Sequence, residues 1–502
     1  MDISFLFQLI CLISYTPMFG YCSQPTIRNP NDVDWASVTD SRGNKFPDFS
    51  FCGYHNSDIP IPDINQRDVN ISLPRITSND FSPMIQAAID AVSASGGGVV
   101  QLPSGRINIT AGIQLHSNVV LTGTGNRATT LALINQPSKP VFRLGTPSDA
   151  ALTLNAISKI TDTYIPVGSR TIHVTSTTRL RVGQDVYVSR IVTEPWVRYN
   201  GMSDLFRYGL RQQWIPTGKR IMSPNTIQAI NGNTITLKIP ITDNLDATYM
   251  DPELRAYTLP QQSTEIGIQN LRIEVPNTCS GRQLLDPTCN NAAIEISSWT
   301  NDCWVSNLML VGFNRFIDIK THSSRITIQD VIMDRNKDIF GVALPIDIFI
   351  QGHQVIIQDC HQVGINKARS FSVSTDSLTP GPNAILRYNT NSSIQTLAPH
   401  ERWSWGLLIE QTTAPTIIEN RGNKGTGQGW TMNAAVGWNL RTNVTFQTPP
   451  LGINWCVGCG KNQGPVGNAT FIRSGSHVRP RSLFHAQLIA RGVEWSNRGS
   501  DE

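Results

Sequence analysis

Basic and imidazole side chains gather in two polar stretches of the C-terminal half of the chain. His400 and Arg402 lie in the first stretch, and Arg421 and Lys424 lie in the second. A planar guanidinium can bind both oxygens of a carboxylate, and a His, Lys or Arg side chain with a lowered pKa can remove a proton. β-Elimination in a uronic-acid polymer needs both functions, together with an acid for the leaving oxygen. We therefore take these four residues as the catalytic candidates.

Further side chains near these stretches have types that suit a carbohydrate ligand. Aromatic faces bind the apolar faces of sugars, although Trp is also a common packing residue. Cations from earlier parts of the chain would extend a groove for an acidic ligand, although exposed Lys and Arg are more often simply solvated. The substrate-binding candidates are Trp403, Trp405, Trp430, Glu401, Lys367, Arg369 and Lys337.

Carboxylates in the chain are compatible with a second reaction, glycoside hydrolysis. Glycoside hydrolases use a pair of carboxyl groups whose separation decides the stereochemical outcome. The candidates for such a pair are Glu401, Glu410, Asp334, Asp338 and Asp347. No calcium-loop spacing is visible among these residues, so no cofactor is assigned and the use of Ca²⁺ stays open.

A repeated pattern of short strands predicts the scaffold that would position these residues. An apolar residue, a spacer and Asn or Asp return roughly every 23 to 32 residues from Val305 onward, which is typical of stacked solenoid turns. An ordinary sandwich, with a strand every 8 to 12 residues or so, does not explain the constant register. The triplets are Ile268-Gln269-Asn270, Val305-Ser306-Asn307, Ile328-Gln329-Asp330, Ile357-Gln358-Asp359, Ile418-Glu419-Asn420 and, with the polar residue lost, Leu386-Arg387-Tyr388.

A short helix is predicted before the first strands. Ser82 and Pro83 suit a helix start, Ile85, Ile89 and Val92 form one apolar stripe, and the glycines that follow end the helix. Strands are expected directly afterwards, in residues 99–103 and 119–125.

Several of these segments together resemble the pectate lyase superfamily. They are GGGVVQLPSG (96–105), NVVLTGTG (118–125), DFSFCGY (48–54), PHERWSWG (399–406) and NRGNKGTGQGW (420–430). The last two are similar to a bacterial and fungal branch with a His-Arg-Trp cluster and an Asn-Arg-Gly-Asn segment. The resemblance implies an all-β chain folded as a single right-handed parallel β-helix, pectin-lyase-like, whose N-terminal end is plugged by the helix. An uncapped stack would leave a core and a strand edge exposed.

The sequence predicts five consecutive segments, of which the β-helix is the last and longest. We expect a signal peptide in residues 1–23, an extended N-terminal arm in 24–78, the cap and first turns in 79–150, a β-rich insertion in 151–260 and the main β-helix in 261–495. The signal assignment rests on the apolar run from Phe5 to Tyr15, which is shorter than the roughly 20 residues of a membrane span.

Cysteines and glycosylation sequons agree with export. Seven cysteines follow the signal, so at least one has no partner within the chain. Cys279 and Cys289 could close a loop, and we interpret Cys456 and Cys459 as a structural pair because no further zinc ligands are spaced to join them. The Asn-x-Ser/Thr sequons that we expect to be glycosylated begin at Asn70, Asn108, Asn391, Asn443 and Asn468.

Composition excludes some classes of function and leaves three hypotheses. A formal charge of +4 without a long basic run argues against nucleic-acid binding, and we expect a secreted, extracellular monomer with a polysaccharide as its partner. The first hypothesis is a polysaccharide lyase and the second is a glycoside hydrolase. The third is a glycan-binding protein without activity, which Gln428 favours because relatives tend to carry His at that position.

Overall fold

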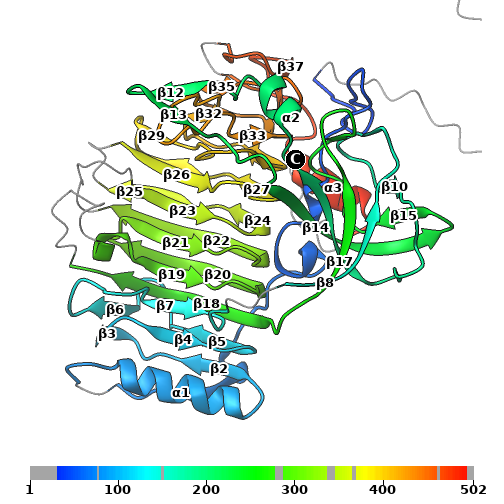
Figure 1. The fold of residues 1–502 in the computed structure, drawn as a ribbon. Helices are drawn as coiled ribbons and strands as arrows, with labels where there is room; N and C mark the ends of the chain where they lie inside the picture. Colours follow the sequence, from blue (N-terminus) through cyan, green and yellow to red (C-terminus); the bar gives the residue numbers. More distant parts are fainter. Residues whose placement is uncertain are drawn as a thin grey trace, which may run out of the picture.

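The chain folds around one long coil of parallel strands. The computed structural model describes residues 31–75, 78–148, 152–276, 287–335, 345–364, 369–460 and 464–493. Successive turns of the coil are hydrogen-bonded to one another in parallel from the N-terminal end to the C-terminal end (Figure 1). This pairing confirms the predicted parallel β-helix.

The coil has three faces, and each face is a parallel sheet. The first face contains β1 (Val69–Ser72), β2 (Gly98–Gln101), β5 (Val119–Thr122), the first halves of β18 (Ser263–Glu274), β20 (Thr300–Val311) and β22 (Ser324–Arg335), then β24 (His353–Gln358), β27 (Asn383–Leu386), β31 (Leu407–Glu410), β34 (Val436–Trp438), β36 (Trp455–Val457) and β37 (Thr470–Ile472). The second face contains β4 (Ile113–Leu115), β7 (Phe142–Leu144), β19 (Ala292–Ile296), β21 (Arg315–Ile319), β23 (Ile346–Ile350), β26 (Ser370–Thr375) and β29 (Gln395–Thr396). The third face contains β3 (Gly105–Ile109), β6 (Thr129–Leu133), the second halves of β18, β20 and β22, β25 (His361–Gly364) and β28 (Asn389–Thr390). Two short pairs, β30 (Ser404–Trp405) with β33 (Met432–Asn433) and β32 (Thr416–Ile418) with β35 (Val444–Phe446), continue the coil toward its C-terminal end.

Apolar side chains stack inside the coil from one turn to the next. Ile268, Val305, Ile328, Ile357 and Ile385 are register partners on consecutive turns, and all of them are fully buried. β-Branched side chains pack well on such a pleated surface. Burial of each column, at about 25 cal/mol per Å² of apolar surface, holds the register between turns.

The Asn and Asp residues of the repeated triplets occupy the corner between the first and third faces. Asn270, Asn307, Asp330 and Asp359 all have a φ between 50° and 60°, the left-handed conformation that Asn and Asp tolerate best. The predicted corner is therefore confirmed on these four turns.

The last two triplets were assigned to the corner incorrectly. Ile385 and Leu386 pair with Ile357 and Gln358, which puts Arg387 at the corner one residue earlier than the triplet implied. The next corner residue is Gln411, whereas the triplet that ends at Asn420 follows β32 in a separate small sheet. The hydrophobic pattern alone did not distinguish these strands.

An amphipathic helix lies at the N-terminal end of the coil. The helix α1 (Ser82–Ala94) starts with Pro83 in its first turn and buries Ile85, Ile89 and Val92. It packs against β2, β4 and β5, the first strands of the stack (Figure 1). The packing covers the apolar interior that this end would otherwise expose.

The segment between β7 and β18 leaves the coil as an antiparallel sheet. Its strands, in spatial order, are β10 (Thr171–His173), β15 (Thr234–Leu237), β14 (Arg220–Asn231), β11 (Asp185–Ile191), β17 (Glu253–Thr258) and β8 (Thr153–Lys159). Smaller elements accompany it: β9 (Tyr164–Ile165), α2 (Glu194–Tyr199), β12 (Leu205–Arg207), β13 (Leu210–Gln212) and β16 (Leu245–Asp246). We call residues 152–262 the insertion. It leaves and returns at the corner between the second and first faces, where Thr146 N donates to Ser263 Oγ at 3.0 Å.

The N-terminal arm crosses the outside of the first face. It contains η1 (Phe49–Phe51), η2 (Tyr54–Ser57) and η3 (Gln66–Asp68), and one more 3₁₀ turn, η4 (Pro287–Asn290), precedes β19. The arm packs between the coil and the C-terminal helix α3 (Leu483–Ala490), where Gln487 Oε1 accepts from Phe49 N at 2.9 Å.

The start of α3 rests on a buried carboxyl group. Glu410 is fully buried, accepts from Leu483 N at 2.9 Å, and burial raises its pKa to about 7. A carboxyl pKa that is higher in the folded chain than in the unfolded chain stabilises the fold at low pH, and this contribution is lost as the pH rises toward 7 and beyond. We expect the free energy of unfolding to fall by about 2–3 kcal/mol between pH 5 and pH 8 through this group. Urea unfolding of the protein and of Glu410→Gln at both pH values tests this, because the variant should lack that part of the decline.

The cysteines and sequons follow the expectations where the structure describes them. Cys456 and Cys459 form a disulfide, and Cys289 is disulfide-bonded, while Cys279 lies outside the described residues. Three buried cysteines are free thiols: Cys52, Cys303 and Cys360. All five sequon asparagines are exposed, and their glycosylation stays a prediction. None of the described helices is long and apolar enough to cross a bilayer.

Candidate functional site

The two predicted loops lie side by side on neighbouring turns. Arg402 N donates to Gln428 O at 3.0 Å, and Arg421 Nη1 donates to His400 O at 2.8 Å. The His400 ring approaches Gln428, with 3.2 Å between His400 Nε2 and Gln428 Nε2. Burial lowers the pKa of His400, and although Glu401 opposes this shift, the imidazole is neutral at pH 7. The sequence therefore placed the loops next to each other correctly.

The cations of these loops are engaged in contacts that fix the loops. Arg402 donates to Trp214 O at 2.7 Å and to Thr426 Oγ1 at 2.5 Å, and it pairs with Glu401. The Arg421 guanidinium is largely buried, and burial lowers its pKa. Lys424 is exposed and pairs with Glu419 at 3.1 Å. Of the three, Lys424 is the most exposed to solvent.

The predicted sugar-binding role is wrong for two of the tryptophans. Trp403 and Trp405 are 0 % and 1 % exposed, because they form a common core with Trp196 and Trp214 of the insertion. A ring without an exposed face cannot stack on a sugar. Trp430 is partly exposed, and its Nε1 donates to Asn200 O at 2.9 Å. Arg369 is exposed, and Lys367 and Lys337 lie outside the described residues.

The carboxylates proposed for hydrolysis are dispersed. Asp347 is fully buried against Arg335, and Glu410 supports α3, so neither can reach a substrate. Asp334 is partly exposed on the third face, and Asp338 lies outside the described residues. Glu401 has a second carboxylate near it: one of its oxygens lies within 4.8 Å of a carboxylate oxygen of Asp376 and of a ring nitrogen of His400.

A cleft that the sequence did not reveal opens between the insertion and the coil. We call it the insertion cleft, and its volume is about 510 Å³. One wall is formed by β11, β14 and β17, and the other is the corner between the second and first faces on four consecutive turns. The lining includes Asp185, Tyr187, Lys219, Arg220, Lys238 and Tyr257 from the insertion, and Trp299, His322, Arg325, Gln351 and His353 from the coil.

The cleft is rich in cations and poor in carboxylates. Its lining includes Lys219, Arg220, Lys238 and Arg325 but only one acidic residue, Asp185. The two lysines are exposed and form no ion pair with any described residue. This balance favours an anionic ligand.

Two histidines line the coil side of the cleft. The His322 ring stacks on Trp299 with 4.2 Å between the ring centroids, and burial lowers its pKa. Burial lowers the pKa of His353 to about 3. Because both pKa values are lowered, both rings are neutral at pH 7. Neither ring makes a hydrogen bond to a described residue, so their nitrogens are available to a ligand.

Two tyrosines, Tyr187 and Tyr257, line the insertion wall of the same cleft. The rings of Tyr187 and Tyr257 stack with 4.3 Å between their centroids. Burial raises the pKa of Tyr187 to about 12 and also raises that of Tyr257. Both hydroxyls are therefore protonated at neutral pH and can act as proton donors.

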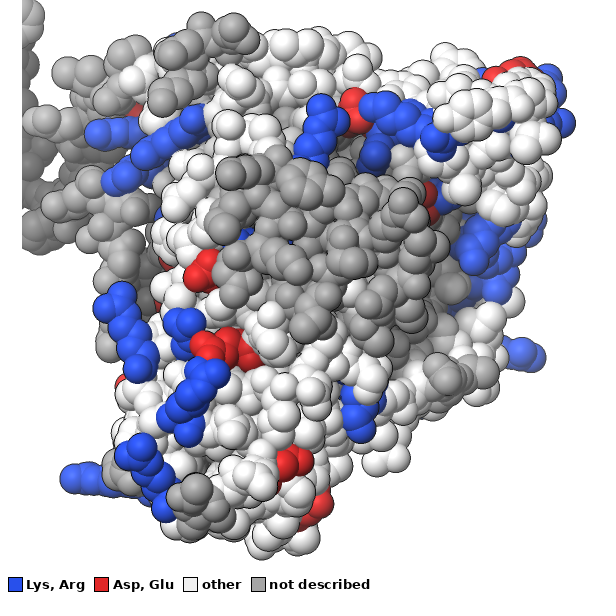
Figure 2. Space-filling model, turned by 90° about the vertical axis from the view of Figure 1, so that its left-hand side faces the viewer, with Lys and Arg blue, Asp and Glu red and all other residues white. Residues whose placement is uncertain are grey.

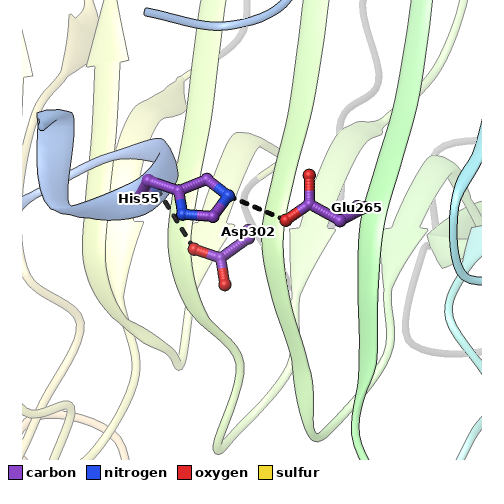
Figure 3. Close-up of side chains that lie close together, drawn as sticks. All are labelled: His55, Glu265 and Asp302. Carbon is purple, nitrogen blue, oxygen red and sulfur yellow. Dashed lines mark hydrogen bonds and ion pairs between the residues drawn. The ribbon is translucent and has the colours of Figure 1, made fainter. Parts of the chain in front are cut away.

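The arm helps to position Arg325. Arg325 Nε and Nη2 donate to the two oxygens of Asp302 at 2.7 and 2.8 Å, and His55 N donates to the same carboxylate at 3.1 Å. The His55 ring, in turn, contacts Glu265 at 2.7 Å, as Figure 3 shows. Tyr54 donates to the other Glu265 oxygen at 2.5 Å.

This His55, Glu265 and Asp302 cluster has the residue types of a metal site, and its ligand atoms lie within 4.8 Å of one another. However, every carboxylate oxygen in it already has a hydrogen-bond partner. The network therefore holds the arm on the coil and orients Arg325.

The sequence offered only a weak signal for this cleft. Trp299 and His322 stand at equivalent positions just before the first-face strand on consecutive turns, so the triplet repeat could have aligned them, whereas His353 begins the strand of the next turn two residues out of that alignment. The insertion precedes these turns directly in the sequence, but no local pattern indicates which side of the coil it covers.

Comparison with known proteins yields structural neighbours only. Neither the protein-family models nor the curated proteins include a match. Among solved structures, the tailspike protein gp49 of Pseudomonas phage LKA1 has a TM-score of 0.30 at 15% identity, with 78% of this chain and 71% of that chain covered. The Gp54 tailspike of Acinetobacter baumannii bacteriophage AP22, in complex with a capsular saccharide, has a TM-score of 0.31 at 10% identity over 79% and 67% of the chains.

The tailspike of E. coli bacteriophage HK620, in complex with a pentasaccharide, has a TM-score of 0.37 at 12% identity, and this chain spans about half of its length (76% and 53% covered). The assignment of a parallel β-helix to this chain is based on the strand pairing within the chain itself.

Figure 1 shows the insertion on the right, and the left-hand side of the molecule faces away from it. Figure 2 displays this left-hand side, and in its visible part Lys and Arg side chains are spread out with Asp and Glu among them. A band of one sign, as a nucleic-acid ligand would require, is not visible there.

Proposed function

We propose that this chain is a secreted carbohydrate-active protein that binds an acidic polysaccharide in the insertion cleft and cleaves it by β-elimination. The observation that carries the proposal is the composition of the cleft: four cations, one carboxylate and two neutral histidines without hydrogen-bond partners among the described residues. The catalytic role moves from His400, the sequence-based candidate, to His322.

The cleft contains the groups that each step of the reaction needs. Lys219 and Lys238 neutralise the uronate carboxylate, which makes the C5 proton more acidic. Neutral His322 removes that proton, and the electron pair forms the C4–C5 double bond while the C4–O bond to the leaving sugar breaks. The Tyr187 hydroxyl protonates the leaving oxygen. Trp299 fixes the orientation of the His322 ring by stacking.

The reaction is tested by incubating the purified chain with pectate, alginate, glucuronan and ulvan. We expect ultraviolet absorbance from the unsaturated product with at least one of these polymers, and none with a neutral glucan. New reducing ends without that absorbance would indicate a hydrolase, and binding without any product would indicate a glycan-binding protein. Either outcome would overturn the proposed elimination.

The lysines give a second prediction, which concerns substrate binding. Each exposed charge close to a ligand carboxylate contributes about 1 kcal/mol, so Lys219→Gln combined with Lys238→Gln should raise KM about tenfold or more and change kcat less. Kinetics at two salt concentrations measure this, because screening should raise KM of the native protein toward that of the variant. Lys159→Gln, an exposed lysine elsewhere on the insertion, is the control. An equal rise in KM for this control would contradict the assignment.

A further inference from the structure

A second group of polar side chains converges beside the predicted loops. Asp376 follows β26 on the second face, and His400 and Glu401 follow β29 on the next turn. Their ligand atoms all lie within 4.8 Å of one another, and all three residues are partly exposed. Imidazole nitrogen and carboxylate oxygen together form a donor set that Zn²⁺ and Mn²⁺ accept.

Two carboxylate oxygens of this cluster remain available. Asp376 Oδ2 accepts from Gln351 Nε2 at 2.6 Å, and Glu401 Oε1 pairs with Arg402. The other oxygen of each carboxylate accepts no hydrogen bond from a described residue. Because Arg402 is also held by Trp214 O and Thr426, it can keep its place when Glu401 binds a ligand through its second oxygen.

The buried side-chain amide of Gln428 lies next to His400 of this cluster. Gln428 is 7 % exposed, and its Oε1 is buried without a hydrogen-bond partner. Its Nε2 lies 3.2 Å from His400 Nε2, and a half-turn of the amide exchanges the two atoms. An unpartnered buried carbonyl oxygen is costly. After the half-turn Oε1 faces His400, where either a His400 N–H or a cation at the cluster satisfies it.

We propose that Asp376, His400, Glu401 and Gln428 form a binding site for one divalent transition-metal cation of the Zn²⁺ or Mn²⁺ type. Calcium fits less well because it takes oxygen ligands only. The site does not depend on the elimination reaction in the insertion cleft, so either proposal can fail alone.

Calorimetric titration of the chelator-treated full chain with Zn²⁺, Mn²⁺ and Ca²⁺ tests the site. We expect one Zn²⁺ or Mn²⁺ per chain and weaker Ca²⁺ binding. Asp376→Asn and Glu401→Gln should each weaken metal binding at least about tenfold. The matched control is Glu265→Gln in the His55 cluster, which has the same residue types but no available oxygen, and it should bind metal as the native chain does.

A variant that gains affinity separates ligation from misfolding. Imidazole is a better zinc ligand than an amide oxygen, so Gln428→His should tighten Zn²⁺ binding about tenfold or more. Absence of one-to-one binding, unchanged affinity in Asp376→Asn and Glu401→Gln, equal loss in Glu265→Gln, or no gain in Gln428→His would overturn the proposal.

Discussion

Replacement of His322 by alanine should lower the rate of eliminative cleavage by about 10²- to 10⁴-fold, the usual contribution of a positioned general base. The imidazole lies in the insertion cleft, stacks on Trp299 and has no hydrogen-bond partner among the described residues. Nothing on the described part of the chain competes for its nitrogens, so they can accept the C5 proton. KM should change little, because the lysines rather than His322 bind the substrate carboxylate.

Two further variants separate proton transfer from packing. His322→Phe keeps a flat ring against Trp299 but has no nitrogen, so it should lose as much activity as His322→Ala. His361→Ala removes an exposed histidine from β25 on the third face and should retain full activity. If His322→Phe retains activity, the His322 ring only supports the cleft. If activity is instead lost in a third variant, His353→Phe, then His353 on the next turn is the base.

The pH profile provides an independent measure of the same role. Because burial lowers the pKa of His322 below its ordinary value, the base stays neutral to a lower pH than an ordinary histidine does. We expect the acidic limb of kcat/KM of the native protein to lie below the ordinary histidine pKa of about 6.5. A profile that rises through pH 7 would contradict a base of this kind.

The coil could be predicted from the sequence because its determinants are local and repeated. Each turn places an inward apolar residue and a left-handed Asn or Asp at fixed spacing, as at Ile328 and Asp330. The prediction failed where that signal weakened. Arg387 occupies the corner without an Asn or Asp side chain, and the strand that ends at Ile418 has a similar pattern but belongs to another sheet.

The candidate site was predictable only in part, for a related reason. Adjacency of the His400 and Arg421 loops follows from the coil itself, since equivalent loops on neighbouring turns must lie side by side. The burial of Trp403 and the existence of the insertion cleft depend on where the insertion packs. That packing is set by contacts such as the edge-to-face packing of Trp403 on Trp196 and the hydrogen bond from Trp403 Nε1 to Asp243 Oδ1, which join segments with no shared local pattern.

The largest effect on stability is expected at the ion pair inside the coil. Arg335 and Asp347 are 2 % and 0 % exposed at their side chains and form a direct salt bridge. Asp347 Oδ2 also accepts from Tyr388 Oη and Gln395 Nε2, each at 2.6 Å. Removal of one partner leaves a buried charge uncompensated, so Arg335→Met should lower the free energy of unfolding by about 3–5 kcal/mol at pH 7. Reversible urea unfolding followed by tryptophan fluorescence measures this loss.

A double variant and a change of pH identify the uncompensated charge as the cause. In Arg335→Met with Asp347→Asn, the amide oxygen still accepts from Tyr388 but carries no charge, so the double variant should be more stable than Arg335→Met alone. Burial already raises the pKa of Asp347, and loss of Arg335 raises it further. At low pH the Asp347 carboxylate of Arg335→Met therefore takes up a proton, which removes the uncompensated charge. Its deficit relative to the native chain should therefore shrink between pH 7 and pH 4. A deficit that is constant with pH, or a double variant no more stable than the single one, would show that lost packing rather than the isolated carboxylate destabilises the coil.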